Sequence, residues 1–241
     1  MAAQPGLRRE LWLASGAVQP AWRFLGRGFN STSWPAWVDG PNSTALFDSG
    51  AAPTAHQACP YPGVFRDAVT FGSGHAKGFL FPDNSYDIAN TDDYWIEGII
   101  NAPNAGGQVL VRSSLQFYLS GTTIAMYWAD ASPGPVIPGI VGAGWLDFMV
   151  GHNRSVNHAD GFRSFVNGIA VGTPANYYSK ATTVDLPWRI GQDASGGYGM
   201  NGSIAYLALY KGAGLISDAD PVGEMTTLAA ERSRHMRCRK V

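Results

Sequence analysis

Apolar and polar residues alternate in many short segments of the chain, with the period of two that indicates β-strands. Turn-forming residues separate these segments at intervals of about 8–12 residues, the spacing typical of a β-sandwich. Three prolines fall within residues 133–138, and we predict an exposed loop there rather than a central strand. The predicted strands of the central part of the chain are 68–72, 78–81, 94–100, 108–112, 115–119, 122–128 and 145–151.

The clearest local signal is a hairpin centred on Asn167-Gly168. Apolar residues alternate with others on both sides of this dipeptide, from Gly161 to Thr173. Asn and Gly tolerate the positive φ angles that a two-residue type I′ turn requires. The chain continues with Trp188-Arg-Ile-Gly and then with a nearly continuous apolar segment over 202–210, which predicts a buried strand.

This order of elements resembles the laminin-G or concanavalin-A-like jelly roll. The resemblance rests on the Val-Asn-Gly hairpin, the Ile-Gly strand and the Gly-x-Ile-Ala strand that begins at Gly202. It implies an all-β fold, a two-sheet antiparallel jelly-roll sandwich. It does not fix a function, because this sandwich hosts lectins, adhesion modules, glycan hydrolases and virion proteins.

We expect three parts in the chain: an N-terminal basic arm over 1–27, the sandwich over 28–214, and a C-terminal helix and basic tail over 215–241. Ser217 or Asp220 is the predicted cap of the helix, and Pro221 suits its first position because no N–H bond is lost there. We expect the helix to end near Arg234.

Charge is distributed unevenly along the chain. Residues 1–27 carry a net charge of +3 and residues 230–241 carry +4, so 28–229 carry −8 within a total of −1. Basic ends on an acidic globule predict arms that dock on neighbouring subunits; solvated tails are the alternative. The residues expected to hold such an assembly are Arg8, Arg9, Arg23, Arg27, Arg234, Arg237 and Arg239.

The acidic residues argue against catalysis. Hydrolases of the resembled fold place three carboxylates on alternate positions of one strand, where they flank a glycosidic bond. Here only Asp93 and Glu97, on either side of Trp95, come near that arrangement. We predict that the protein is not an enzyme, with a glycan hydrolase of the same fold as an alternative.

No cofactor is predicted. The resemblance implies that a rim calcium ion would involve Asp193, with Asp147 or Asp130 as a partner, since Ca²⁺ binds carboxylate and carbonyl oxygens. His152 and His158, six residues apart in one polar loop, do not have a recognised metal-ligand spacing.

A binding surface is expected where aromatic residues gather near loops. Exposed aromatic rings stack on sugars and anchor protein interfaces. The alternative for Trp188 and for several of the tyrosines is packing in the core or at a strand edge. The predicted binding residues are Tyr177, Tyr178, Trp188, Asp193 and Tyr198.

Function is predicted by elimination and resemblance. Residues 1–28 lack the apolar stretch of a secretory signal, and Cys59 and Cys238 do not form a disulfide framework, so we expect synthesis in a cytoplasm. Single-sandwich proteins of this kind resemble tailed-phage virion components. We therefore expect a non-catalytic capsid decoration, head-fibre or tail-fibre protein on a virion surface. Its partners would be other virion subunits, in a homo-oligomer such as a trimer, and a surface polysaccharide.

A carbohydrate-binding lectin-like module is the alternative to this structural role. The basic ends carry no nucleic-acid motif, and no apolar run in the sequence is long enough to cross a bilayer.

Overall fold

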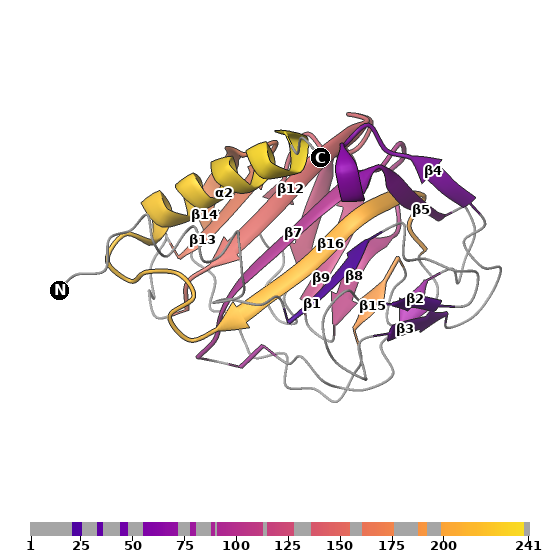
Figure 1. Cartoon of the computed structure of the whole chain (residues 1–241). Coiled ribbons are helices and arrows are strands. Elements are labelled where there is room, and N and C mark those ends of the chain that lie inside the picture. The colour runs from indigo at the N-terminus through magenta and orange to yellow at the C-terminus, as the bar shows by residue number, and fades with distance from the viewer. Residues whose placement is uncertain are drawn as a thin grey trace.

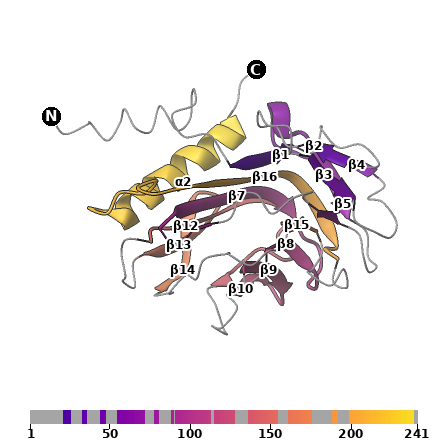
Figure 2. The same ribbon diagram turned by 90° about the horizontal axis from the view of Figure 1, so that it is seen from below.

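The computed structural model describes residues 21–25, 33–35, 44–47, 55–71, 78–80, 88–89, 91–112, 115–127, 136–154, 161–175, 188–191 and 199–238. Two antiparallel sheets stack on each other, and one long helix lies on the outer face of one of them (Figures 1 and 2). The predicted fold class, an antiparallel β-sandwich with a C-terminal helix, is confirmed.

We call the first sheet sheet A. Its order is β14 (Ile169–Ala175), β13 (Phe162–Val166), β12 (Trp145–His152), β7 (Asp93–Asn101), β16 (Gly202–Gly212), β5 (Asp67–Phe71) and β4 (Ala55–Ala58). The long strand β16 pairs with β5 near its start and with β1 (Trp22–Leu25) further along, where Trp22 is opposite Leu209. The single strand β16 therefore pairs with two short strands, one after the other along its length.

We call the second sheet sheet B. Its order is β11 (Val136–Ile137), β10 (Thr123–Tyr127), β9 (Leu115–Ser120), β8 (Gln108–Arg112), β15 (Arg189–Ile190), β6 (Phe79–Leu80), β3 (Thr44–Phe47) and β2 (Ser33–Pro35). The short β11, which directly precedes Pro138, is an edge strand, a position in which neighbouring prolines are tolerated; residues 136–137 therefore pair with β10 where a loop was predicted.

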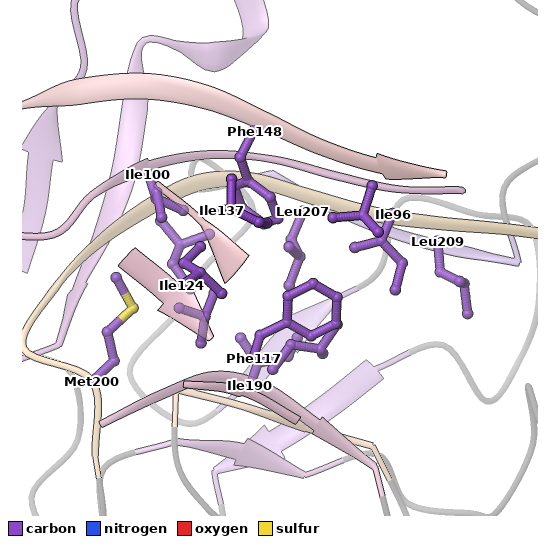
Figure 3. Close-up of a cluster of buried hydrophobic side chains, with 14 of the residues drawn as sticks. Ile96, Ile100, Phe117, Ile124, Ile137, Phe148, Ile190, Met200, Leu207 and Leu209 are labelled. Carbon is purple, nitrogen blue, oxygen red and sulfur yellow. The ribbon is translucent and has the colours of Figure 1, made fainter. Parts of the chain in front are cut away.

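The main core fills the space between the two sheets. Side chains from β7, β12 and β16 meet those of β8, β9, β10 and β15, and Phe117 lies close to Phe148 with ring centroids 6.4 Å apart (Figure 3). Each fully buried large apolar side chain stabilises a domain by about 1.5–3 kcal/mol. The residues labelled there are Ile96, Ile100, Phe117, Ile124, Ile137, Phe148, Ile190, Met200, Leu207 and Leu209.

A second apolar cluster lies on the other face of sheet A, under the helix α2 (Pro221–Cys238). Met225 and Ala229 of this helix are fully buried against Trp95 and Phe165 of the sheet. The segment around the 3-10 helix η2 (Gly63–Phe65) covers the neighbouring part of the same face. Sheet A is thus covered on both faces, which explains why β7 and β16 are buried along nearly their whole length.

Three local predictions have clear outcomes. The hairpin is confirmed: Asn167 and Gly168 have φ angles of 54° and 77°. Asp220 caps α2, since its Oδ1 accepts the Gly223 N–H at 2.9 Å, and the helix continues to Cys238 rather than ending near Arg234. The boundary of the arm at residue 27 is wrong, because Trp22 and Phe24 are fully buried in β1 of the sandwich.

Candidate functional site: the outer face of sheet B and two buried carboxylates

The outer face of sheet B, turned away from sheet A, carries polar and aromatic side chains. Along β9, Leu115, Phe117 and Leu119 are buried in the core, and the alternating Gln116 and Tyr118 are partly exposed on the other face. This is the period-two pattern of a strand with one solvated side.

Tyr118 lies in a row that crosses three strands. Its register partners are Ala125 on β10 and Gln108 on β8, and Ala125 is in turn opposite Val136, which is 44% exposed. Because Ala125 ends in a methyl group, little side chain stands between the tyrosine and the exposed edge strand.

Two amides join this row to the next one. Gln108 Nε2 donates to Gln116 Oε1 at 3.1 Å, while Gln108 Oε1 is buried and has no hydrogen-bond partner in the described part of the chain. Gln116 is opposite Val111, and Val111 is opposite Arg189 of β15. Since Ile190 packs in the core, Arg189 belongs to the outer face.

We name the set Gln108, Gln116, Tyr118 and Arg189 the sheet B surface. It presents an aromatic ring, the Gln116 amide and a cation, with the buried Gln108 amide behind them; these are the groups with which proteins stack on and hydrogen-bond to polyhydroxylated ligands. This surface was missed in the sequence. The signal was present in the Leu-Gln-Phe-Tyr-Leu-Ser alternation of residues 115–120, where the polar positions share one face.

Glu97 lies on the opposite side of the molecule, under α2, and is fully buried. Arg232 of the helix donates through Nε to Glu97 Oε2 at 2.9 Å and through a second nitrogen to Oε1. Trp95 Nε1 and the Tyr206 hydroxyl donate to the same carboxylate at 3.0 and 2.7 Å. Burial raises the pKa of Glu97, but the Arg232 charge and these hydrogen bonds outweigh it and hold the pKa below its usual value.

Asp147 forms a second buried cluster beneath the same helix. Its Oδ2 accepts hydrogen bonds from Tyr61 Oη at 2.9 Å, Ser233 Oγ at 3.0 Å and Arg237 Nε at 3.0 Å. Burial, followed by the Asp147 charge, raises the pKa of Tyr61. Arg237 also donates to the side chain of Asn167 in the hairpin turn. The two carboxylates therefore attach α2 to the sheet.

The Asp93 carboxylate also accepts hydrogen bonds from within the protein. Its side chain accepts the backbone N–H groups of Arg154 at 2.8 Å and Ile216 at 3.1 Å. Burial raises the pKa of Asp93, against the lowering effect of these two hydrogen bonds. Asp93 and Glu97, the nearest approach to a catalytic row, are each buried among protein donors.

The structure corrects the position of Trp188. It is fully buried, and its ring meets that of Trp22 edge-on at 5.5 Å between centroids. This is the core-packing alternative, and the indole has no exposed face for a sugar. The other predicted binding residues, Tyr177, Tyr178, Asp193 and Tyr198, lie outside the described residues.

Only some of the arginines predicted to hold an assembly lie in the described part of the chain. Arg234 is exposed on α2, whereas Arg237 is tied to Asp147. Arg23 lies within β1, with its backbone opposite Ala208. Arg8, Arg9, Arg27 and Arg239 lie outside the described residues.

The histidine and calcium hypotheses are also affected. His152 is not in a loop: it ends β12 and is 4% exposed, with its ring 5.2 Å from that of Tyr94. Asp147 is bound by Tyr61, Ser233 and Arg237, while His158 and Asp130 lie outside the described residues. Among the residues that the structure describes, no three His, Cys, Asp or Glu side chains gather in a group that could hold a metal ion.

Cys59 is a buried free thiol, and burial raises its pKa to about 11. Within the same described ranges, no helix is both long and apolar enough to cross a membrane.

Comparison with solved structures identifies β-sandwich domains. The chain is similar to domain 4 of AbnA, an extracellular arabinanase from Geobacillus stearothermophilus solved with arabinotriose, with TM-score 0.56, 13% identity, and 88% of this chain and 98% of that domain covered. It is also similar to the binding domain of botulinum neurotoxin serotype G, with TM-score 0.56, 10% identity, and 89% and 51% covered.

A third similar structure is a Trypanosoma rangeli sialidase in complex with sialic acid, with TM-score 0.52, 12% identity, and 95% and 37% covered. The chain thus spans nearly the whole arabinanase domain, about half of the toxin binding domain and little more than a third of the sialidase. At these identities the likeness shows the fold alone. Neither protein-family models nor curated protein sequences give a match.

Proposed function

We propose that the protein is a carbohydrate-binding β-sandwich module and that the sheet B surface contacts the glycan. The observation that carries the proposal is the row in which Tyr118 stands beside Ala125 and Gln108 on an outer sheet face. A tyrosine ring gives stacking area to a sugar, and the partly exposed Gln116 amide, which the buried Gln108 side chain holds in place, gives hydrogen bonds to its hydroxyl groups. The similarity to an arabinanase domain solved with arabinotriose supports the same ligand class.

We propose binding without hydrolysis. Hydrolysis of a glycosidic bond needs two carboxyl groups facing the sugar. In the described part of the chain, Asp93, Glu97 and Asp147 are all engaged by backbone or side-chain donors on the helix side of sheet A. A glycan hydrolase remains the alternative, and Glu97→Gln tests it: a glycan cleaved equally well by this variant excludes Glu97 from catalysis.

The test is calorimetric titration of the full chain with arabinotriose and with a panel of neutral and acidic oligosaccharides. Tyr118→Ala should weaken the affinity for the ligand that binds by about tenfold, which corresponds to about 1.4 kcal/mol. Ile169→Ala is the control, because Ile169 is 70% exposed at the hairpin and belongs to sheet A. Equal affinities of Tyr118→Ala and the parent protein would overturn the assignment of the sheet B surface.

A second proposed function is a structural or attachment role in a larger assembly, such as a capsid decoration or fibre protein of a virion. The observation that favours it is the contrast between basic ends and a remainder of −8. Arg232 turns inward onto Glu97 and Arg237 is paired with Asp147 while its side chain stays 44% exposed, so fewer unpaired C-terminal charges face outward than the sequence implies.

The assembly role is tested by light scattering of the full chain and of a chain lacking residues 1–20. Deletion has to stop before Trp22, since β1 belongs to the core. An oligomer that becomes a monomer supports an arm-held assembly, and a monomer in both cases counts against it.

A further inference from the structure

A row of neutral polar side chains crosses the helix side of sheet A, beyond the part that α2 covers. The backbone register places Trp145 of β12 opposite Asn101 of β7, Asn101 opposite Ser203 of β16, and Ser203 opposite Thr70 of β5. Neighbouring strands are about 4.8 Å apart, so the row extends over about 14 Å.

The side chains of this row point away from the main core. The next residues along each strand, Leu146, Ile100, Ile204 and Val69, are all buried between the two sheets. Successive side chains of a strand alternate between faces, so the row belongs to the opposite face.

At one end of the row, two hydroxyl groups and one amide side chain are joined by hydrogen bonds. Ser203 Oγ donates to Gln57 Oε1 of β4 at 2.5 Å, and the Thr70 hydroxyl lies 3.0 Å from the Ser203 hydroxyl. Gln57 is exposed and Thr70 is partly exposed, so these two side chains border solvent, whereas Ser203 is buried and holds them in place.

Trp145 forms the aromatic end of the row. It packs against the cluster under α2, and the residue is only partly buried. Gly144, with a φ of 78°, precedes it and fixes the turn from which β12 starts. Asn101, directly opposite, is also partly exposed.

The row contains no charged side chain. Asp147, two residues along β12 from Trp145, is neutralised by Arg237 at 3.0 Å. An indole edge followed by amides and hydroxyls matches a ligand with apolar ring faces and many uncharged hydroxyl groups. An acidic ligand would find no cation among Trp145, Asn101, Ser203, Thr70 and Gln57.

We infer that Trp145, Asn101, Thr70 and Gln57, together with the buried Ser203 to which Gln57 and Thr70 are hydrogen-bonded, form a second binding site, the sheet A strip, and that its ligand is an uncharged glycan chain lying across the strands. This inference goes beyond the proposed function because it concerns the other sheet, and it stands or fails separately from the sheet B surface. A protein with both sites presents two glycan-binding faces.

The test follows the indole N–H signal of Trp145 by NMR in the full chain, with Trp145→Phe used to assign it. Neutral oligosaccharides of glucose, mannose and arabinose are titrated to millimolar concentration. We expect the Trp145 signal to shift while those of the fully buried Trp22, Trp95 and Trp188 stay in place. Acidic oligosaccharides of similar length should shift it less.

Two variants separate the strip from the sheet B surface. Asn101→Ala should weaken the glycan affinity measured from the Trp145 signal by about tenfold, a change of about 1.4 kcal/mol. Gln116→Ala, which removes an amide from the other sheet, should leave it unchanged. Thermal unfolding of both variants verifies that they are folded.

The unfavourable outcomes are distinct. If Tyr118→Ala weakens the binding of a glycan that does not shift the Trp145 signal, the assignment of the sheet A strip is overturned and that of the sheet B surface stands. No shift of Trp145 by any neutral oligosaccharide overturns the strip as well, and tighter binding of acidic chains overturns the ligand class.

Discussion

Arg232 reaches from α2 into the sandwich and holds Glu97, 135 positions earlier in the chain, with 2.9 Å between Nε and Oε2. The arginine side chain is 8% exposed and the glutamate is fully buried. The Tyr206 and Tyr210 hydroxyls surround the pair and share its hydrogen bonds. A buried pair of this kind is satisfied on all sides, so loss of one partner leaves an uncompensated charge inside the protein.

Glu97→Gln should therefore lower the free energy of unfolding by about 3–5 kcal/mol, because Arg232 keeps its charge without a counter-charge. Urea unfolding followed by fluorescence measures this loss. The double variant Glu97→Leu with Arg232→Met should recover part of it, since no buried charge remains. Arg234→Ala, exposed on the same helix, should change stability by less than about 0.5 kcal/mol. A loss as small in Glu97→Gln would show that the pair does not stabilise the fold.

Stability should also depend on pH through Glu97. Its pKa is lowered in the folded protein from the usual value of 4.5. The ionised form therefore contributes stability that is complete above pH 4.5 and is lost as the pH falls through the lower, folded value. Unfolding of the parent protein in urea between pH 7 and pH 3 should show this decline. Glu97→Gln should decline less steeply, and parallel curves for the two proteins would contradict the prediction.

Gly168→Ala should be more damaging than Gly121→Ala. Both glycines have positive φ angles, 77° and 55°, so each substitution brings strain of about 1–2 kcal/mol. A Cβ at position 168 would also lie 2.8 Å from Ser233 Cβ, whereas a Cβ at position 121 meets nothing within 4 Å. The clash should add about 1–3 kcal/mol. Equal losses in a thermal unfolding comparison would show that the hairpin turn does not press against α2.

Trp22→Ala should destabilise the sandwich by about 3–5 kcal/mol, the usual effect of truncating a large buried aromatic. Trp22 is fully buried, contacts Trp188, and lies opposite Leu209 in sheet A. Chemical unfolding measures the loss. A near-neutral result would mean that β1 is not part of the folding unit and would restore the boundary of the arm at residue 27.

The sequence was sufficient for elements that local residues determine. Asn167-Gly168 and the alternation around it specify a turn and two strands with no information from the rest of the chain. Pro221 after Asp220 specifies the start of α2 for the same reason. The apolar segments over 94–100 and 202–210 predict buried strands, and both are buried along these positions.

Sequence reasoning failed where a side chain's role depends on distant partners. Nothing near Glu97 or Asp147 indicates that Arg232 and Arg237 will neutralise them, because the pairs form only when α2 docks on sheet A. Trp188 was misplaced for a different reason. Trp188 directly precedes β15 and is buried in the core together with Ile190. The period of two along Trp188-Arg-Ile therefore pointed to the core, but the position of the tryptophan beside loops favoured a binding role.

The two sheets differ in how freely their residues can change. Sheet A is an inner layer over much of its extent, with sheet B on one side and α2 with the η2 segment on the other. A substitution in β7 or β16 disturbs packing on one face or the other. The outer positions of β9 and β10, such as Tyr118 and Ala125, alternate with the core residues and do not support them. Variation at these positions can therefore change the outer surface of the protein while the fold stays intact, so sheet B is the layer whose exposed side chains are most free to evolve.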